Sequence, residues 1–310
     1  MFDSSTLNEY GFLGCFDTIC MMMGERVAVV KGITENYYSD QIHFDEETSD
    51  YSNEEEIEKF YGVSFYELQE LSIALCQQLS YRHGVTNGGV VLINCGLHNV
   101  AEIVSILACC RLNATIVPID ERWLYDGDRI KNIINDCKPV AVILVANDDN
   151  DPVIKSYSNA GLFRFSLLNQ DGYLIEPDGF SIELNTCDEA SDRHYDSNPL
   201  YILYTSGSTA NPKGVRGTES GLLSRIGWQW LQYPWDREEI ACQRTSLTFV
   251  DSLAEIFSAL LAGIPIWSPE RLLFQETGLV GIAEEANRIG VSRITLLPSQ
   301  LCQGILVIQM

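Results

Sequence analysis

The stretch Tyr204–Val215, which reads YTSGSTANPKGV, determines how the rest of this 310-residue chain is interpreted. It gathers four hydroxyl side chains around Gly207 and ends with a lysine behind a proline. Small residues let the backbone approach a ligand closely, and hydroxyls and exposed N–H groups donate hydrogen bonds to phosphate oxygens. Lys213 adds a point charge aimed at the same place. Because the stretch continues the apolar run Leu200–Thr205, we predict a loop that follows a strand and wraps the phosphates of a nucleotide.

The spacing excludes the commoner phosphate loops. A Walker loop ends in Gly-Lys-Ser/Thr, whereas Lys213 stands between Pro212 and Gly214. The three-glycine dinucleotide pattern is absent, and in Gly217–Gly221 the serine comes one place late for a nucleophile elbow. The alternative interpretation is a polar surface turn, because clusters of Ser, Thr, Gly and Pro are usually loops.

YTSGSTANPKGV resembles the phosphate-loop signature of the adenylate-forming superfamily, which includes acyl-CoA synthetases, luciferases and peptide-synthetase adenylation domains. Ala210 departs from the pattern, since the family most often has glycine there, and alanine is costly only where φ is positive. The resemblance implies bound ATP, with Mg²⁺ bridging phosphate oxygens and few protein ligands on the metal. No covalent nucleophile is needed, so Ser206 is not interpreted as one. The implied contacts to the β- and γ-phosphates are Thr205, Ser206, Gly207, Ser208, Thr209, Lys213 and Gly214.

Further blocks resemble the same superfamily in the order that it requires. They are Ser64–Leu79, Leu107–Asp120, Thr245–Gly263 and Arg293–Leu301. The resemblance therefore covers most of the chain from about Arg26 to Leu301. Within the superfamily, Gly217–Trp235 and the order Phe249-Val250-Asp251 resemble β-alanine-activating, aminoadipate-semialdehyde-dehydrogenase-like enzymes and their plant acyl-activating relatives.

The resemblance places the substrate pocket at Phe249, Val250 and Asp251. Phe249 falls at the family's aromatic gate beside the carboxylate, with a core aromatic as the alternative. Peptide-synthetase domains have next an aspartate that pairs with the amino group of an α-amino acid, and here that position is Val250. A β-amino or plain carboxylic acid is therefore favoured. Asp251 faces elsewhere or caps the following helix, although a one-residue slip would make it the counter-charge. For Trp228, Trp230 and Trp235, core packing is favoured over a place in the pocket.

Short β-rich runs alternate with amphipathic helical patterns along the chain. This alternation predicts a doubly wound α/β fold with buried, mostly parallel sheets, whose ligands bind beyond the carboxyl ends of the strands. The resemblance identifies it as the N-terminal portion of the adenylate-forming fold, without the C-terminal subdomains. We expect strands at 26–30, 89–94, 114–119, 140–145, 200–205, 264–267 and 293–297, and helices at about 64–82, 99–112, 126–137, 219–231, 251–262 and 272–288.

Composition narrows the class of protein. A net charge of −23 argues against nucleic acid, and the segment 45–58, which holds eight carboxylates, reads as a solvated acidic loop. The ten cysteines include no C-x-x-C pair, so we expect buried, reduced thiols in a cytoplasmic protein. No metal site is predicted from residue spacing, and no apolar run is long enough for a membrane span.

The predicted organisation is a variable N-terminal segment at 1–25, a partial AMP-dependent synthetase/ligase domain at 26–301 and a truncation tail at 302–310. The late catalytic lysine of relatives does not occur in this sequence, so we expect a fragment or a natural short isoform that lacks pyrophosphate exchange by itself. The expected function is activation of a carboxylic or β-amino acid to an acyl-adenylate. A phosphopantetheine or CoA thiol, on a carrier domain or free, then accepts the acyl group. The alternatives are a fatty- or aryl-acyl-CoA synthetase, or a non-catalytic nucleotide-binding or interaction remnant.

Overall fold

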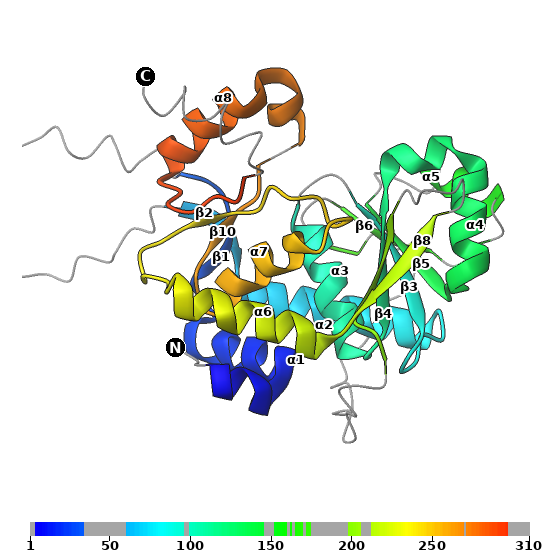
Figure 1. Cartoon of the computed structure of the whole chain (residues 1–310), viewed down its shortest axis with the longest axis horizontal. Helices are drawn as coiled ribbons and strands as arrows, with labels where there is room; N and C mark the ends of the chain where they lie inside the picture. Colours follow the sequence, from blue (N-terminus) through cyan, green and yellow to red (C-terminus); the bar gives the residue numbers. More distant parts are fainter. Residues whose placement is uncertain are drawn as a thin grey trace, which may run out of the picture.

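Two β-sheets lie on either side of a central layer of helices (Figure 1). The chain is seen here in a computed structural model. It describes residues 4–33, 60–95, 99–145, 152–159, 162, 165–169, 172–174, 198–205, 212–269 and 271–296. The order of layers is α8, the smaller sheet, the central helices, the larger sheet, and then α4 with α5 (Figure 1).

The larger sheet has the strand order β6-β5-β3-β4-β7-β8. Its strands from β6 to β7 are parallel, and β8 is antiparallel to β7. The mostly parallel sheet of the predicted fold class is therefore confirmed. The bounds are β3 Val90–Cys95, β4 Thr115–Asp120, β5 Ala141–Val145, β6 Phe165–Leu168, β7 Tyr201–Thr205 and β8 Lys213–Gly217.

The smaller sheet has the order β2-β1-β10-β9, with β2 antiparallel to β1 and the other pairs parallel. The strand expected at 293–297 is reduced to one bridge, Ala241 with Arg293, in the part of it that the structure describes, which ends at 296. The bounds are β1 Val27–Ile33, β2 Phe60–Ser64, β9 Ala241–Cys242 and β10 Ile266–Trp267.

The predicted helices form within a few residues of the expected bounds, and side chains cap several of them. Ser64 and Glu67 form a reciprocal capping box before α2, while Asn99 and Thr218 cap α3 and α6. The bounds are α1 Ser4–Met23, α2 Phe65–Tyr81, α3 Val100–Arg111, η3 (a 3₁₀ turn) Glu121–Tyr125, α4 Gly127–Cys137, α5 Pro152–Asn159, α6 Glu219–Gln232, α7 Asp251–Leu260 and α8 Arg271–Ile289.

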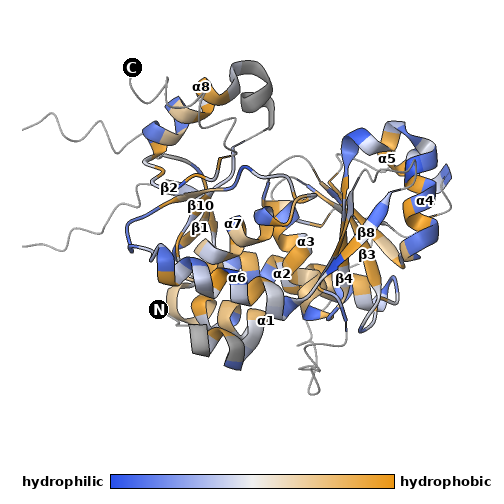
Figure 2. Ribbon diagram, viewed as in Figure 1, coloured by the Kyte–Doolittle hydropathy of each residue, from blue (hydrophilic) through white to orange (hydrophobic). Residues whose placement is uncertain are grey.

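The continuous apolar runs of the strands arise because both faces of each sheet are covered (Figure 2). On β3, Val91 and Ile93 face the core of the central helices, while Leu92 packs with residues of α4 and α5 on the outer face. In the smaller sheet, Val29 faces the central core and Val30 packs toward α8. The period-two alternation of side chains thus divides each run between two cores.

Helix α1 was not expected from the sequence, yet it forms part of the central core. Phe12 and Phe16 are buried, and the Phe12 ring meets Phe257 of α7 edge-on, with centroids 4.5 Å apart. Asp17 accepts from the Arg111 guanidinium of α3 at 2.8 Å. Residues of α1 thus pack in the same core as β1, and the division into a variable segment at 1–25 and a domain at 26–301 stays a prediction.

The cysteines in the described ranges are free thiols, and most of them are buried, as expected. Burial raises the pKa of Cys15 to about 11 and that of Cys20 to about 12. These thiols therefore carry almost no reactive thiolate near neutral pH and act as small apolar core residues.

Candidate active site

The predicted phosphate loop connects β7 to β8, which pair as an antiparallel hairpin. Thr205, the last residue of β7, is the register partner of Lys213, the first residue of β8, and both are exposed. The structure therefore brings together the two ends of the predicted loop. Ser206, Gly207, Ser208 and Thr209 lie outside the described residues, so their predicted contacts stay predictions.

The sequence predicted that the loop leads directly into a helix, whereas in the structure the strand β8 comes first. Lys213 and Gly214 begin this edge strand, and α6 starts only at Glu219, behind the cap at Thr218. Both faces of β8 are largely exposed, so it carries no apolar pattern by which the sequence would reveal it.

Two glycines of β8 are explained by aromatic rings of β7. A Cβ at Gly214 would lie 2.8 Å from Ile202 and 3.2 Å from the Tyr204 ring, and one at Gly217 would lie 1.9 Å from Cζ of Tyr201. A side chain at Gly217 therefore requires the Tyr201 ring to move, and one at Gly214 requires Ile202 to shift. Gly214, predicted as a phosphate contact, thus also has a packing role in the hairpin.

Tyr204 anchors the end of β7 to helix α4. Its hydroxyl donates to the Asp136 carboxylate of α4 at 2.6 Å. Burial, together with this hydrogen bond, raises the pKa of Tyr204 well above its usual range. The residue before the loop is consequently held as a neutral donor, and the direction in which the chain leaves the sheet is defined.

Asp120 ends β4, the parallel neighbour of β7, so it lies at the same edge of the sheet as the loop. Its buried carboxylate accepts from Arg122 through the backbone N–H at 2.9 Å and through Nε at 2.8 Å. The carboxylate is therefore partly neutralised beside the loop. The sequence gives only a weak sign of this pair, an arginine two residues after a strand-ending aspartate.

The predicted pocket residues lie where α7 begins, and all three are exposed. Phe249 is 63% exposed and Val250 is 47% exposed, so the alternative of Phe249 as a core aromatic is wrong. The Phe249 backbone N–H donates to the Ser246 carbonyl, and the Ser252 hydroxyl donates to the Phe249 carbonyl. An exposed ring on a hydrogen-bonded turn is available to a ligand.

The interpretation of Asp251 as a helix cap is also wrong. Val250 occupies the N-cap position and makes no side-chain capping bond, while Asp251 is the first residue of α7. A carboxylate in the first turn of a helix is still favoured by the helix dipole. Asp251 is therefore an exposed negative charge that is not used in capping.

Glu255, which sequence reasoning did not single out, is a buried carboxylate one turn further along α7. Its Oε2 atom accepts from the backbone N–H groups of Arg244 at 3.0 Å and Thr245 at 2.8 Å. The Thr245 hydroxyl donates to Oε1 at 3.4 Å. Burial raises the pKa of Glu255 to about 7, although these hydrogen bonds and the Arg244 charge oppose the rise.

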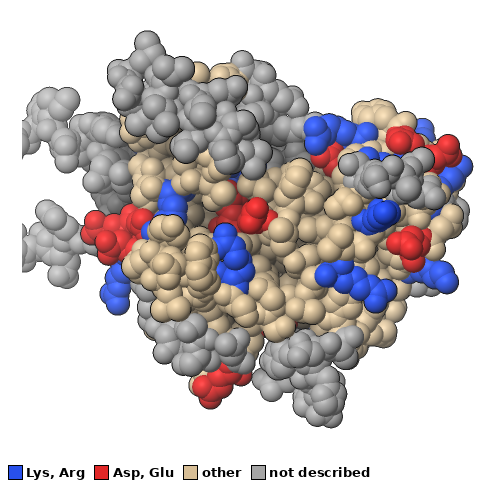
Figure 3. Space-filling model, viewed as in Figure 1, with Lys and Arg blue, Asp and Glu red and all other residues tan. Residues whose placement is uncertain are grey.

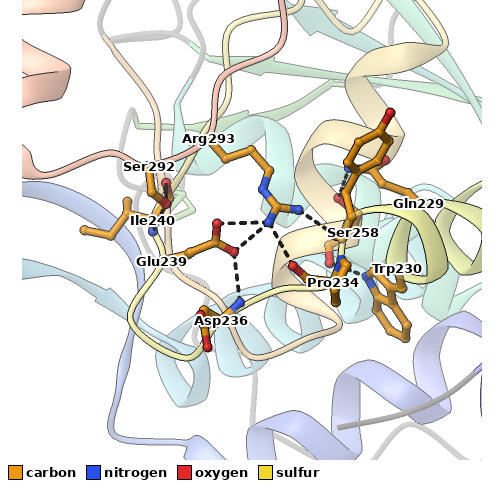
Figure 4. Close-up of polar contacts among 10 residues, drawn as sticks. Gln229, Trp230, Pro234, Asp236, Glu239, Ile240, Ser258, Ser292 and Arg293 are labelled. Carbon is orange, nitrogen blue, oxygen red and sulfur yellow. Dashed lines mark hydrogen bonds and ion pairs between the residues drawn. The ribbon is translucent and has the colours of Figure 1, made fainter.

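The tryptophans mainly pack, as the sequence favoured. Trp230 donates from its indole N–H to the Ser258 carbonyl at 2.8 Å, which fastens α6 to α7 (Figure 4). Trp235 is buried, and the Arg293 guanidinium lies 3.6 Å from its ring centroid. Trp228, by contrast, is 49% exposed.

Arg293 ties the segment after α6 to the end of the smaller sheet (Figure 4). Its guanidinium donates to both oxygens of Glu239, the shorter contact being 2.7 Å, and to the Pro234 carbonyl at 3.0 Å. Both contacts to Glu239 come from Nη2, and hydrogen bonds between two charged groups are stronger than neutral ones. The segment that leads from α6 toward Phe249 and Val250 is thereby anchored to Arg293.

Basic and acidic side chains are interspersed over the face shown in Figure 3. Within the described ranges, Lys213 makes no ion pair with a carboxylate. In a chain with a net charge of −23, a cation left unpaired at the mouth of a hydroxyl-rich loop is available to an anionic ligand. Among the helices that the structure describes, none is both long and apolar enough to cross a membrane.

Comparison with known proteins gives a consistent result. The family model described as AMP-binding enzyme matches residues 44–301. The beta-alanyl-bioamine nonribosomal peptide synthetase ebony of Drosophila melanogaster is 29% identical over 227 residues, which are 73% of this chain and 24% of that protein. The chain thus spans about a quarter of the length of this relative.

Solved structures with the same fold include VinN, with a TM-score of 0.67, 14% identity, and coverage of 96% of this chain and 64% of that one. O-succinylbenzoate coenzyme A synthetase from Bacillus subtilis, solved with ATP and a magnesium ion, gives a TM-score of 0.63 and 17% identity. The match covers 94% of this chain and 65% of that one.

Proposed function

Because the chain belongs to the AMP-binding enzyme family, we propose that it serves the ATP-dependent activation of a carboxylic or β-amino acid. The observation that carries the proposal is the register pairing of Thr205 with Lys213 at the mouth of the hydroxyl-rich loop, where Lys213 forms no ion pair with any described carboxylate. The loop lies at the carboxyl edge of a parallel sheet, where α/β folds bind their ligands. Loop and fold therefore favour the same ligand, a nucleoside triphosphate.

The proposed reaction is a transfer of adenylate. A carboxylate oxygen of the acid attacks the α-phosphorus of ATP, and the bond from that phosphorus to the pyrophosphate oxygen breaks. Pyrophosphate leaves with its charge, and the acyl-adenylate remains. Lys213 and the hydroxyls from Thr205 to Thr209 hold the β- and γ-phosphates and stabilise the charge that develops on them. Mg²⁺, when bound, neutralises charge between phosphate oxygens.

Lys213→Ala is expected to raise the Kd for Mg-ATP about 10- to 100-fold, because one charge-assisted contact is worth about 1.5–3 kcal/mol. The measurement is calorimetric titration of ATP with Mg²⁺ in excess. Arg216→Ala is the matched control, since it removes another exposed cation from the same strand, three residues further from the loop. Unchanged affinity in Lys213→Ala, or an equal loss in Arg216→Ala, contradicts the assignment of Lys213 to the phosphates.

The proposed substrate is a β-amino or simple carboxylic acid. Its support is Val250, an uncharged residue at the position where α-amino-acid-activating relatives place an aspartate, and the similarity to a beta-alanyl synthetase. An α-ammonium group placed against valine lacks a counter-charge. The activated acyl group then passes to a phosphopantetheine or CoA thiol, on a carrier domain or free. The reduced thiols fit a reducing compartment such as the cytoplasm.

Val250→Asp is expected to tighten the binding of L-alanine about five- to thirtyfold, because an ion pair at a half-exposed position is worth about 1–2 kcal/mol. The wild-type chain is expected to bind β-alanine more tightly than L-alanine. Both are measured by calorimetry in the presence of a non-hydrolysable ATP analogue. Val280→Asp is the control, since Val280 on α8 is also 47% exposed.

A wild-type preference for L-alanine that Val250→Asp leaves unchanged means that other residues determine the substrate. Asp251→Asn then becomes the decisive variant. A loss of L-alanine binding in that variant identifies Asp251 as the counter-charge and reverses the proposed substrate class.

A further inference from the structure

Glu255 is an unusual residue for the place that it occupies. It is 7% exposed on a helix whose other buried residues include Leu253, Ile256 and Phe257. Neutral side chains would fill such a site without the cost of burying an ionisable group. What the carboxylate supplies is one oxygen that accepts two consecutive backbone N–H groups of the segment before the helix.

Glu255 holds the segment that follows directly after the smaller sheet. Gln243, which precedes it, is fixed to the smaller sheet, because its backbone N–H donates to the Trp267 carbonyl and its side chain accepts from Ser268. Glu255 then holds the next two residues, Arg244 and Thr245. From that point the chain runs to Phe249 and Val250, with Leu247 buried in the central core and the Phe249 carbonyl accepting from the Ser252 hydroxyl of α7.

We propose that Glu255 is a positioning residue: through Arg244 and Thr245 it sets the path of the segment that presents Phe249 and Val250 to the acid substrate. The inference rests on the proposed function, because it concerns the acid-binding side of the same site. Glu255 does not touch the substrate. It acts only through the backbone that it holds.

The neighbours of Glu255 are an arginine, a cysteine and neutral side chains. Arg244 faces it from the segment itself and favours the charged form, and Cys242 faces it from β9. Helix α6 meets α7 through the neutral side chains of Gln229 and Trp230. Strand β10, also packed on α7, holds only Ile266 and Trp267.

The ionised and protonated forms of Glu255 hold the segment differently. The ionised carboxylate accepts all three hydrogen bonds, and bonds to an ionised acceptor are about twice as strong as neutral ones. When Glu255 is protonated, one oxygen becomes a donor and the backbone bonds become neutral. Since its pKa is raised to about 7, the segment is held less firmly at pH 6 than at pH 8.

The first test measures hydrogen exchange of the 244–250 amides in the full chain. Glu255→Ala is expected to speed exchange at Arg244 and Thr245 about 10- to 100-fold, because two backbone donors lose their acceptor. Glu255→Gln, whose amide oxygen replaces Oε2, is expected to keep the protection. Glu284→Gln on α8 is the matched control for loss of an exposed carboxylate. Unchanged exchange in Glu255→Ala overturns the proposal.

The second test measures the Kd of β-alanine between pH 6 and 8, where neither group of that ligand titrates. In the wild type, the Kd is expected to rise about three- to tenfold as the pH falls, because the charge-assisted bonds weaken. Glu255→Gln is expected to give a flat profile, and Mg-ATP binding is expected to stay within about twofold in both. A profile that persists unchanged in Glu255→Gln overturns the proposal.

The two tests separate this inference from the function on which it rests. Absence of both ATP and β-alanine binding in the wild type refutes the proposed function. Faster exchange in Glu255→Ala still supports the positioning of the segment in that case. Normal ligand binding with unchanged exchange refutes the positioning role alone.

Discussion

Phe257→Ala is expected to lower the free energy of unfolding by about 3–5 kcal/mol, the usual loss when a buried phenylalanine becomes alanine. Phe257 is fully buried on α7, and its ring contacts Phe12 of α1 edge-on at 4.5 Å. The substitution removes buried apolar surface and leaves a cavity between α1 and α7, the helix that follows Phe249 and Val250. Urea denaturation followed by circular dichroism gives the measurement.

The control for this prediction comes from the same block of sequence. Phe249→Ala removes the same atoms from a ring that is 63% exposed, so the expected loss of stability is below about 1 kcal/mol. Equal losses in the two variants contradict the assignment of one ring to the core and the other to the surface. Phe249→Ala is instead expected to affect ligand binding.

Glu255→Gln is expected to stabilise the protein at alkaline pH, by an amount that grows to about 3 kcal/mol. The folded pKa of about 7 lies above the ordinary pKa of 4.5 for a glutamate, so between these values the folded state binds more protons than the unfolded state. The contribution of Glu255 is fully present below pH 4.5 and is lost as the pH rises through 7. The pKa difference, at about 1.4 kcal/mol per pH unit, sets the size of the effect.

Urea denaturation of the two proteins at a series of pH values from 4 to 9 provides the measurement. The variant and the wild type are expected to differ little near pH 4, to diverge between pH 4.5 and 7, and to keep a constant difference above pH 7. Glu284→Gln is again the control, because it changes an exposed carboxylate. A constant difference across the series means that the pKa of Glu255 is the same in the folded and unfolded states.

The sequence predicted the parallel sheet and most of its helices, because buried strands and amphipathic helices leave distinct patterns. Helix α1 was missed for a physical reason. Its buried residues Phe12, Cys15, Phe16 and Ile19 share one face, but apolar side chains also occur on its exposed surface, where Met21 is 79% and Met22 is 65% exposed, so the helix lacks the polar face by which surface helices are recognised. Its break at Gly11, where φ is 66°, divides the pattern further.

The candidate site was predicted unevenly. The sequence placed Thr205 and Lys213 at the two ends of one loop, and their pairing in the β7–β8 hairpin agrees with that position, while their contacts to phosphate stay a prediction. The role of Glu255 could not be read, because its partners are backbone N–H groups ten and eleven residues earlier, and these leave no mark on the sequence. Of the alternatives for Asp251, the cap is wrong because α7 begins one residue earlier than a capping aspartate requires.

The glycines opposite Tyr201 and Tyr204 have a consequence for protein engineering. The Tyr201 ring lies where a side chain at Gly217 would be, and Ile202 and Tyr204 crowd the position of a side chain at Gly214, so the pairing of β7 with β8 is specified outside the loop itself. Insertions or deletions between Thr205 and Lys213 therefore leave the side on which Lys213 projects unchanged. Residues 206–211 are consequently a cassette in which loop length and composition can be varied to select among phosphorylated ligands, while the lysine stays in place.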